Sequence, residues 1–400
     1  MDTAITTTLK LIKEGNTNLL VPKSSLEDKV PPHYPAFFNP LAELNRDISI
    51  YLYNAFLEDN HNNGEITFAD AFAGIGPRGL RVAVEVPKVS RVFINDVNEL
   101  AIDIAKESAA LNSILDKCFF STSEVCKFLI SRHSTVHNDR FSIIDLDPFG
   151  SPAPFIDCVL RSIENGGLIS VTATDTAVLS GIYQNVCLRK YSGISINNTY
   201  SNEVATRLLL SSIALQAARL GITVLPVFAH SNRHYFRIFL QLSFSKNQAN
   251  DVFSNIGYIQ HCFKCGDRNT FQSSRSTTDK CQICNVKTSV AGQLWTGKLY
   301  DKKILSKINE IYLEQDYSKT NRLFKQIKKI FTTSFQELDD IPYYFSLDEI
   351  GSMLRTSPIK LMELIEKLSL SGFNASRTIF RPTGFKTNAS IHEILSLLKN

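Results

Sequence analysis

Along the first 245 residues, short apolar runs alternate with stretches in which apolar residues recur at helical spacing. Short apolar runs bounded by Gly, Pro, Asn or Asp predict buried strands at 66–72, 91–96, 141–147, 168–173, 222–228 and 234–244. Between these runs, apolar positions at helical spacing predict helices at 41–58, from 80, at 99–112, from 154 and at 204–220. Strands that alternate with helices indicate an α/β fold with a doubly wound, mostly parallel sheet, and we expect its last strand to run antiparallel. Residues 1–40 are expected to be irregular.

The second part of the chain has a different pattern. Residues 245–255 are polar and indicate a linker, after which the cysteines cluster within about 256–300. The remainder predicts helices at 304–313, 321–330, 347–354 and 359–370, followed by a basic and aromatic hairpin. This order of elements, in which a short turn joins two helices and a hairpin follows them, is typical of a winged helix. We therefore expect two domains, 1–245 and 246–400, the second an α+β domain that joins the cysteine region to a winged-helix-like part at about 301–400.

A carboxylate, a proline and an aromatic ring follow the predicted strand 141–147 in the sequence Asp147-Pro148-Phe149-Gly150. Ligands of open α/β sheets bind at the carboxyl ends of strands. Asp147 can accept an N–H of a planar exocyclic amine, the backbone beside Pro148 can accept a second, and Phe149 can stack on the ring. Such hydrogen bonds orient the nitrogen lone pair towards a methyl carbon, and Asp147 can take the released proton. The alternative is a strand-to-turn transition with a capping aspartate, and Asp145 is expected to be structural.

A glycine loop lies between a predicted strand and a predicted helix. Gly74 and Gly76 open the pattern G-x-G-x-x-G, the fingerprint of a Rossmann-like cofactor site. Asp96 ends the next predicted strand, where an acid hydrogen-bonds the ribose of an adenosine-bearing cofactor. Arg78 and Arg46 suit the amino-acid carboxylate of S-adenosylmethionine, because a guanidinium binds a carboxylate in a bidentate fork. An arginine also suits a pyrophosphate, so a nicotinamide dinucleotide stays open, as does a tight turn with a surface aspartate.

Four cysteines have the spacing of a metal site. Cys262-x2-Cys265 and Cys281-x2-Cys284 are separated by 15 residues. Two C-x-x-C pairs predict a closed, structural zinc ion held by four thiolates. The alternative is a small ribbon of reduced cysteines without a metal. The remaining cysteines are expected to be ordinary core residues: Cys118, Cys126, Cys158 and Cys187.

A basic segment near the C-terminus interleaves Arg377, Arg381 and Lys386 with Phe380 and Phe385. RNA binding needs cations for phosphates and rings on which unpaired bases stack. We therefore expect these three basic residues to contact RNA, and the alternative is a solvated hairpin packed on its helices.

The composition of the chain excludes few classes of protein. The 400 residues carry a formal net charge of +4, which permits an anionic partner but does not require one. No stretch approaches the roughly 18 uncharged apolar residues of a membrane-spanning helix, and the first twenty residues lack the apolar core of a signal peptide. The sequence therefore predicts a cytoplasmic protein without a membrane partner, and it implies no protein partner.

Taken together, these features resemble the tRNA (guanine-N2-)-dimethyltransferase family, which methylates guanine 26 of tRNA. The resemblance spans most of the chain. Its motifs are Phe38-Asn39-Pro40, Asn45-Arg46-Asp47, the loop 74–81, Asn95-Asp96, the run 145–152, His234-Tyr235-Phe236-Arg237, the four cysteines, Leu294-Trp295-Thr296-Gly297, Ala375-Ser376-Arg377-Thr378 and Gly384-Phe385-Lys386-Thr387. The compact length is similar to that of the archaeal members.

The resemblance implies a function and roles for residues. It implies S-adenosylmethionine as cofactor, tRNA as partner and transfer of two methyl groups to the N2 amine. Arg46, Arg78 and Asp96 would bind the cofactor, Asp147 would be catalytic and Phe37 would lie near the active site.

The sequence departs from the family pattern at two places. Pro77 replaces a larger apolar residue in the glycine loop. Ser123-Glu124-Val125 stands where the family has Asp-Ala-Asn, whose first residue usually meets the adenine. Ser123 and Glu124 are therefore the candidates for the adenine contact.

Two functions from other classes remain open in the sequence. The literal glycine fingerprint also suits a nicotinamide-dependent oxidoreductase, although that activity leaves the amine-facing motif and the cysteines unexplained. A non-catalytic RNA-binding protein would use only the cysteine region and the C-terminal helices.

Overall fold

The structure is a computed structural model that describes residues 9–59, 64–131, 140–232, 234–312, 322–356 and 359–399. The chain forms two compact units, and each contains segments that are distant in sequence. The first unit comprises Met1–Pro148, Phe155–Val171 and Lys302–Phe331, and the second comprises Phe149–Pro154, Thr172–Asp301 and Thr332–Asn400. These units do not divide at residue 245, and the expected domains 1–245 and 246–400 stay a prediction.

The first unit contains parallel strands in the order β5-β4-β3-β6-β7. Their bounds are Thr67–Asp70 for β3, Arg91–Asn95 for β4, Cys118–Ser121 for β5, Phe141–Leu146 for β6 and Ile163–Ala173 for β7. Every residue of β3 and β6 is buried, which explains why these strands are apolar runs without alternation. The predicted α/β arrangement of parallel strands is thus present in this unit, while β5 was not predicted.

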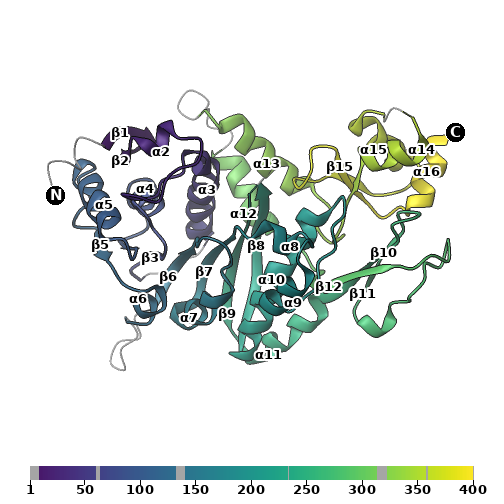
Figure 1. Ribbon diagram of the computed structural model, residues 1–400, viewed down its shortest axis with the longest axis horizontal. Helices are drawn as coiled ribbons and strands as arrows, with labels where there is room; N and C mark the ends of the chain where they lie inside the picture. The colour runs from purple at the N-terminus through teal and green to yellow at the C-terminus, as the bar shows by residue number, and fades with distance from the viewer. Residues whose placement is uncertain are drawn as a thin grey trace. The chain divides into compact units, whose positions relative to one another are not determined.

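Helices accompany these strands in Figure 1. They are α3 (Glu43–Asp59), α4 (Pro77–Glu85), α5 (Glu99–Leu111), α6 (Val125–Ser131) and α7 (Ile156–Ser162). The helix α4 packs against β3 and β4. A disulfide joins Cys126 of α6 to Cys158 of α7, with their Cα atoms 5.4 Å apart. The expectation that these two cysteines are ordinary core thiols is therefore wrong.

An antiparallel hairpin at the N-terminus also differs from the sequence-based expectation. Strands β1 (Leu9–Glu14) and β2 (Thr17–Pro22) pair across Gly15, whose φ of 57° suits glycine. Strand β2 buries Leu19 and Val21 and packs against α5. The prolines at 31–35 lie beyond the hairpin, so they did not indicate the structure of the preceding residues.

The second unit contains the last strands predicted for the sheet. Strands β8 (Ile222–Asn232) and β9 (Tyr235–Phe244) pair antiparallel, which confirms the expected reversal. Helix α10 (Ser201–Arg219) packs against both strands. A separate three-stranded sheet has the order β11-β10-β12, with bounds Arg268–Phe271, Ile256–His261 and Ser289–Trp295. The shorter helices of this part are α8 (Thr176–Leu179), α9 (Gln184–Tyr191) and α11 (Lys246–Ala249).

The C-terminal part of the second unit has its own apolar core. Its elements are β13 (Phe345–Ser346), α14 (Leu347–Leu354), α15 (Leu361–Leu370), β14 (Ala375–Arg377), β15 (Gly384–Thr387) and α16 (Ile391–Lys399). Leu364, Leu368, Phe385 and Ile394 lie in this core. The helices predicted at 347–354 and 359–370 are confirmed in substance, whereas α16 was not predicted.

Two further helical segments follow β12 in the chain. Helix α12 (Lys302–Lys307) continues into a π-helical turn at Ile308–Tyr312, and α13 spans Phe324–Gln336. The predicted helices at 304–313 and 321–330 include residues 313 and 321, which lie outside the described residues. Among the helices that the structure describes, none has the length and apolarity needed to cross a membrane.

Candidate active site

Asp147 follows the carboxyl end of β6 and forms an ion pair with Arg78 of α4. Arg78 Nη2 donates to Asp147 Oδ2 at 2.6 Å. The Asp147 side chain is 29% exposed, while the Arg78 side chain is 5% exposed. A buried cation therefore holds a carboxylate that remains accessible, as an acceptor for a substrate N–H requires. The strand end and the glycine loop are thus joined directly by an ion pair.

The remaining nitrogens of Arg78 are also engaged. Its Nε lies 3.3 Å from Asp145 Oδ2, and its Nη1 donates to Asn45 Oδ1 at 3.2 Å and to Ser49 Oγ at 2.8 Å. Although burial opposes the charged form, Asp145 and Asp147 raise the pKa of Arg78 above its ordinary value. The guanidinium therefore remains charged and has a fixed orientation.

Asp145 contacts Arg78 and two hydroxyl groups through the same oxygen, Oδ2. Its side chain is fully buried, and its Oδ2 accepts from Tyr53 Oη and, at 2.9 Å, from Ser170 Oγ. Tyr53 Oη also lies 2.6 Å from Ser170 Oγ. The structural role expected for Asp145 fits this placement. Tyr53 and Ser170 were missed, because neither residue belongs to a recognisable local motif.

The glycine loop between β3 and α4 is fixed by two carboxylates. Gly74 N donates to Asp96 Oδ2 at 2.8 Å, and Gly79 N donates to Asp70 Oδ2 at 2.8 Å. Gly74 and Gly76 have φ values of 55° and 75°, a conformation that other residues adopt at a cost. Asp96, at the end of β4, therefore lies beside the loop, as a cofactor site of this type requires.

Asp70 lies buried at the end of β3. Burial, together with the negative charge of Asp145, raises the pKa of Asp70 to about 7, even though Arg78 lowers it. Three carboxylates, those of Asp70, Asp145 and Asp147, thus surround one guanidinium. This concentration of charge around the strand ends is typical of functional sites.

Ser123, a candidate for the adenine contact, is hydrogen-bonded to the end of β4. Asn95 Nδ2 donates to Ser123 O at 3.0 Å, and Ser123 N donates to Asn95 Oδ1 at 3.1 Å. Glu124 is exposed, and its Oε2 accepts from Lys127 N at 2.9 Å at the start of α6. The structure therefore places Ser123 beside the end of β4, and it gives Glu124 a helix-capping contact.

Arg46 is paired with a residue that the sequence did not single out. Its Nε and Nη2 donate to Glu14 Oε1 and Oε2 at 2.6 and 2.5 Å, and its guanidinium lies 5.1 Å from the centre of the Phe38 ring. Although burial opposes ionisation of Glu14, Arg46 and then Arg81 lower the pKa of Glu14. The N-terminal hairpin thus supplies the carboxylate that fixes Arg46, and the expected cofactor contact of Arg46 stays a prediction.

The aromatic candidates occupy loops. Phe37 stacks on His33, with ring centres 5.5 Å apart and an interplanar angle of 25°. Phe149 is 65% exposed. The proposed contact of either ring with a base stays a prediction, as does the role of the backbone beside Pro148.

The turn after Phe149 is held by hydrogen bonds within the second unit. Thr174 N donates to Gly150 O at 2.8 Å, and Gly150 N donates to Thr174 Oγ1 at 2.6 Å. Tyr191 Oη lies 2.7 Å from Ser151 Oγ and donates to Asp175 Oδ1 at 2.6 Å. Burial and Asp175 raise the pKa of Tyr191 above its ordinary value. These hydrogen bonds, which the sequence did not predict, pin the loop that carries Phe149.

The four clustered cysteines converge as the spacing predicts. The ligand atoms of Cys262, Cys265, Cys281 and Cys284 all lie within 4.8 Å of one another. Sγ atoms of Cys262 and Cys284 are 3.4 Å apart, and those of Cys265 and Cys281 are 3.6 Å apart. A tetrahedral zinc site with Zn–S bonds of about 2.3 Å has S–S edges of about 3.8 Å. The donor set therefore fits one tetrahedral metal ion.

Lys386 is placed differently from the expected RNA contact. Its side chain is completely buried, and its Nζ lies 2.5 Å from Glu203 Oε1 and 3.1 Å from Glu337 Oε1. This placement corrects the expectation for Lys386, because an ammonium enclosed by two carboxylates cannot reach a phosphate. Burial raises the pKa of Glu337, although Lys386 lowers it. Phe380 and Phe385 are buried as well.

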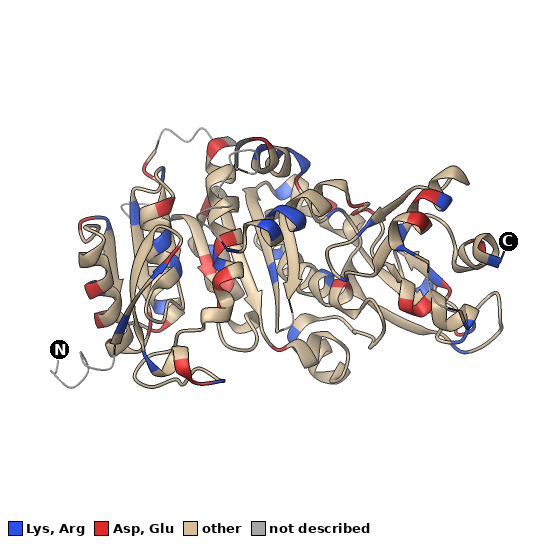
Figure 2. Cartoon of the chain, turned by 90° about the horizontal axis from the view of Figure 1, so that it is seen from above, with Lys and Arg blue, Asp and Glu red and all other residues tan. Residues whose placement is uncertain are grey.

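The other two basic residues of the hairpin are partly exposed. Arg381 pairs with Asp348, with Nη2 and Oδ2 at 2.8 Å, and its side chain is 37% exposed. Arg377 contacts the Met362 sulfur at 4.0 Å. Figure 2 shows basic and acidic residues interspersed over the chain. The RNA contacts of Arg377 and Arg381 stay predictions.

Comparison with known proteins gives a consistent result along the whole chain. The model of the family described as "N2,N2-dimethylguanosine tRNA methyltransferase" matches residues 15–399. A tRNA (guanine(26)-N(2))-dimethyltransferase of Methanothermobacter thermautotrophicus is 35% identical over 387 residues, which cover 97% of this chain and 98% of the relative. The tRNA (guanine(26)-N(2)/guanine(27)-N(2))-dimethyltransferase of Aquifex aeolicus is 30% identical over 399 residues, with coverage of 98% and 96%.

A solved structure is similar over almost the same length. Trm1 from Pyrococcus horikoshii, in complex with S-adenosyl-L-methionine, superposes with a TM-score of 0.82 and 32% sequence identity. The match covers 97% of this chain and 99% of that chain. At this similarity the two proteins share their fold, including the α/β sheet that accompanies the cofactor in the solved complex.

Proposed function

This chain belongs to the N2,N2-dimethylguanosine tRNA methyltransferase family, and on that premise we propose that it dimethylates the N2 amine of guanine 26 in tRNA. The methyl groups come from S-adenosylmethionine. The observation that carries the proposal is the accessible Asp147 carboxylate, held by Arg78 at the end of β6. An amine-directed carboxylate at a strand end is what this chemistry needs and what nicotinamide-dependent oxidation does not use.

The residues around Asp147 suit a reaction based on positioning. In the first transfer the guanine amine would donate N–H hydrogen bonds to Asp147 and to the backbone beside Pro148, so that the nitrogen lone pair is directed at the methyl group. In the second transfer the single remaining N–H would donate to Asp147. S-adenosylmethionine, when bound, supplies that methyl group on a positively charged sulfur. The C–N bond would form as the C–S bond breaks, S-adenosylhomocysteine would leave, and Asp147 would accept the amine proton. Orientation of this kind can supply about 7–11 kcal/mol of the barrier. Phe149 and Phe37 are the rings proposed to hold the base.

The cofactor is assigned to the glycine loop and its neighbours. Gly74 and Gly76 allow close approach of the backbone, and Asp96 lies beside the loop to accept from ribose hydroxyls. Ser123 is the candidate near the adenine, while Glu124 is a weaker one because it caps α6. Arg46 and Arg78 stay candidates for the carboxylate of the cofactor. Both already pair with protein carboxylates, so a cofactor contact would use their remaining N–H groups.

We assign a structural zinc ion to Cys262, Cys265, Cys281 and Cys284. All four positions are filled by thiolates, so the site is closed and takes no part in methyl transfer. The zinc would stabilise a ribbon that β10, β11 and β12 form. Metal analysis of protein purified without added zinc is expected to give one zinc per chain. Loss of the metal by Cys281→Ser without loss of folded ribbon would contradict a structural role.

The C-terminal segment is proposed to be a winged-helix-like tRNA-binding part. Its support is the order of α14, α15 and the β14–β15 hairpin, together with the sheet β13-β15-β14. Arg377 and Arg381 are the proposed phosphate contacts there. A tRNA substrate also leads us to infer a cytoplasmic location.

The test is a nucleoside analysis of tRNA after reaction. A transcript with guanine at position 26 is incubated with the protein and S-adenosylmethionine, digested and examined by mass spectrometry. N2,N2-dimethylguanosine is expected from this transcript and not from one with adenine at 26. A parallel pair of transcripts with guanine or adenine at 27 decides whether a second site is modified. Absence of methylguanosine at saturating cofactor would reject the proposal.

A further inference from the structure

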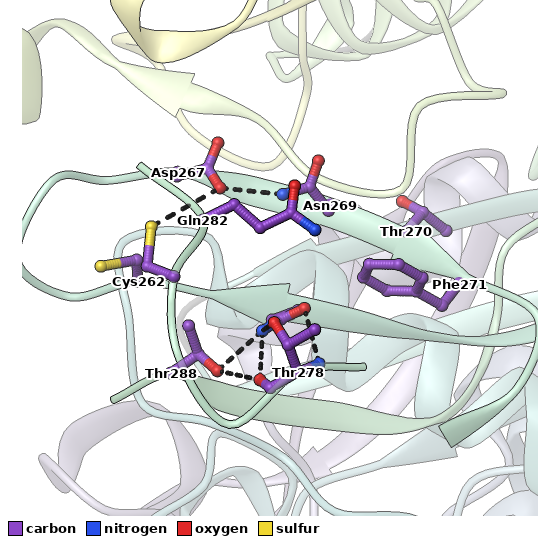
Figure 3. Close-up of a pocket in the computed structure, with 10 residues that line it drawn as sticks. Cys262, Asp267, Asn269, Thr270, Phe271, Thr278, Gln282 and Thr288 are labelled. Atoms are coloured by element: carbon purple, nitrogen blue, oxygen red, sulfur yellow. Dashed lines mark hydrogen bonds between the residues drawn. The ribbon is translucent and has the colours of Figure 1, made fainter. Parts of the chain in front are cut away.

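A polar recess lies beside the cysteine cluster in the second unit. It has a volume of about 190 Å³ and is lined by residues of β10, β11 and the loop before β12. Figure 3 shows Asp267, Asn269 and Gln282 on one side and Thr278 and Thr288 on the other. The Phe271 ring lies at one end of the recess (Figure 3). Besides the Asp267 carboxylate and two cysteines, the lining consists of amides, hydroxyls and one aromatic ring, which are groups that hold an unpaired nucleotide.

The floor of the recess is built by hydrogen bonds. Gln260 is buried, and its Nε2 donates to Thr278 O at 2.5 Å and to Thr288 Oγ1 at 2.8 Å. The rim is different: Gln282 and Thr270 are exposed, and within the described residues their side chains make no hydrogen bond. A fixed floor and unengaged rim groups leave donors and acceptors available for a ligand.

Basic residues flank the recess in sequence, and the lining residue Thr278 donates through its Oγ1 to the backbone oxygen of Lys280 at 2.7 Å. Lys280 and Lys287 face each other across an isolated antiparallel bridge, next to the lining residues Thr278 and Thr288. Both lysines are exposed, and neither forms an ion pair with any residue that the structure describes. Like charges placed opposite each other on paired strands are destabilising. An anion bound between them would remove this repulsion.

We propose that this surface, formed by the recess and by Lys280 and Lys287, binds an unpaired nucleotide of the tRNA substrate. The base stacks on Phe271 and is contacted at its edge by Gln282 and Asn269, while the two lysines hold adjacent phosphates. Thr270 is placed to contact a ribose hydroxyl. The inference deepens the proposed function and rests on it, because it names a second tRNA contact outside the active site.

The competing explanation is that the lysines only offset the negative charge of a zinc ion with four thiolates. That explanation predicts weaker metal retention when the lysines are removed, and no change in tRNA binding. The two explanations therefore differ in two measured quantities, zinc content and tRNA affinity.

The test compares Lys280→Ala/Lys287→Ala, Phe271→Ala and a control, Lys246→Ala/Lys298→Ala, which removes two exposed lysines elsewhere in the second unit. Dissociation constants for the guanine-26 transcript are measured over a salt series, together with zinc content and the single-turnover methylation rate at saturating tRNA. For the lysine pair, the slope of log affinity against log salt is expected to become shallower by about 0.7 for each phosphate that is no longer neutralised. Phe271→Ala is expected to weaken binding by about tenfold or more.

Affinity for tRNA, zinc content and methylation rate together distinguish the possible outcomes. Weaker binding with normal zinc content and a normal rate at saturating tRNA supports the inference, provided that the control pair binds as the unaltered protein does. Unchanged affinity and salt slope in both recess variants would overturn it, as would weaker binding that only follows loss of zinc. If the unaltered protein methylates guanine 26, either of these results rejects the recess alone and leaves the proposed function intact.

Discussion

Arg78 Nη2 donates to Asp147 Oδ2 at 2.6 Å, so a residue of the glycine loop fixes the carboxylate proposed to act on the substrate. The same guanidinium reaches the buried Asp145 through its Nε. The glycine loop and the end of β6 are therefore linked through the Arg78 guanidinium. A substitution in the glycine loop is therefore expected to alter the position of Asp147, and a substitution at Asp147 is expected to alter the loop.

Arg78→Lys should separate positioning of Asp147 from cofactor binding. A lysine cannot reproduce the planar fork that contacts Asp145 and Asp147 together. Because a displacement of about 1 Å can cost about 100-fold in rate, we expect kcat to fall by about that factor. The KM for S-adenosylmethionine should change by less than about tenfold. A large rise in that KM with kcat retained would show that Arg78 serves the cofactor alone.

Tyr53→Phe removes only the hydroxyl that Asp145 accepts from, and keeps the ring that packs edge-on against Phe68. Loss of one buried hydrogen-bond partner is expected to lower the free energy of unfolding by about 1–3 kcal/mol. We also expect kcat to fall while the affinity for tRNA is unchanged, because Asp145 orients Arg78. Chemical denaturation and steady-state kinetics measure the two effects. Tyr51→Phe, on the same helix, is the matched control, and an equal loss of kcat in both variants would contradict the account.

Asp70→Asn tests the raised pKa at the end of β3. Its pKa is about 7 in the folded protein, well above the value of about 3.9 for an unfolded aspartate. Between these values the folded state binds more protons, so the Asp70 contribution to stability falls as pH rises from about 4 to about 7. Asparagine does not titrate and retains an acceptor for Gly79 N. The difference in free energy of unfolding between variant and unaltered protein should therefore change over this range and level off above it, and a difference independent of pH would exclude the raised pKa.

Lys386→Met should destabilise the protein strongly. It leaves Glu337 buried without its cation and leaves Glu203 paired with Arg207 alone, and loss of one partner of a buried ion pair typically costs about 3–5 kcal/mol. Arg377→Ala, in the same hairpin, removes a partly exposed side chain and should change stability by about 0.5 kcal/mol or less. Thermal and urea denaturation would measure both. Equal stability of the two variants would contradict the buried ion cluster.

The motifs that are local in sequence were predictable, and the contacts between distant segments were not. The strand that ends in Asp147 and the glycine loop are each read from a few consecutive residues. Glu14, which fixes Arg46, lies in a hairpin whose turn at Gly15 gave a weaker signal than the nearby prolines. Tyr53 reaches Asp145 from 92 residues away, and no spacing rule connects them.

For Lys386 a local motif gave a wrong prediction, because a contact with a distant segment determines its position. A lysine among aromatic residues is typical of an RNA-binding surface, yet its partner Glu203 is 183 positions away. Sequence alone could not show that α10 supplies a carboxylate to this strand. The disulfide between Cys126 and Cys158 was not predictable for the same reason, since the two residues are joined only when α6 and α7 pack together.

The central claim is that Asp147 orients the guanine amine and accepts its proton. The most direct test is the single-turnover methylation rate of Asp147→Ala and Asp147→Asn on the guanine-26 transcript, with tRNA and cofactor affinities measured in parallel. We predict a rate lower by about 100- to 10,000-fold in both variants, with both affinities within a few-fold of the unaltered protein. Methylation at the unaltered rate in either variant would contradict the claim.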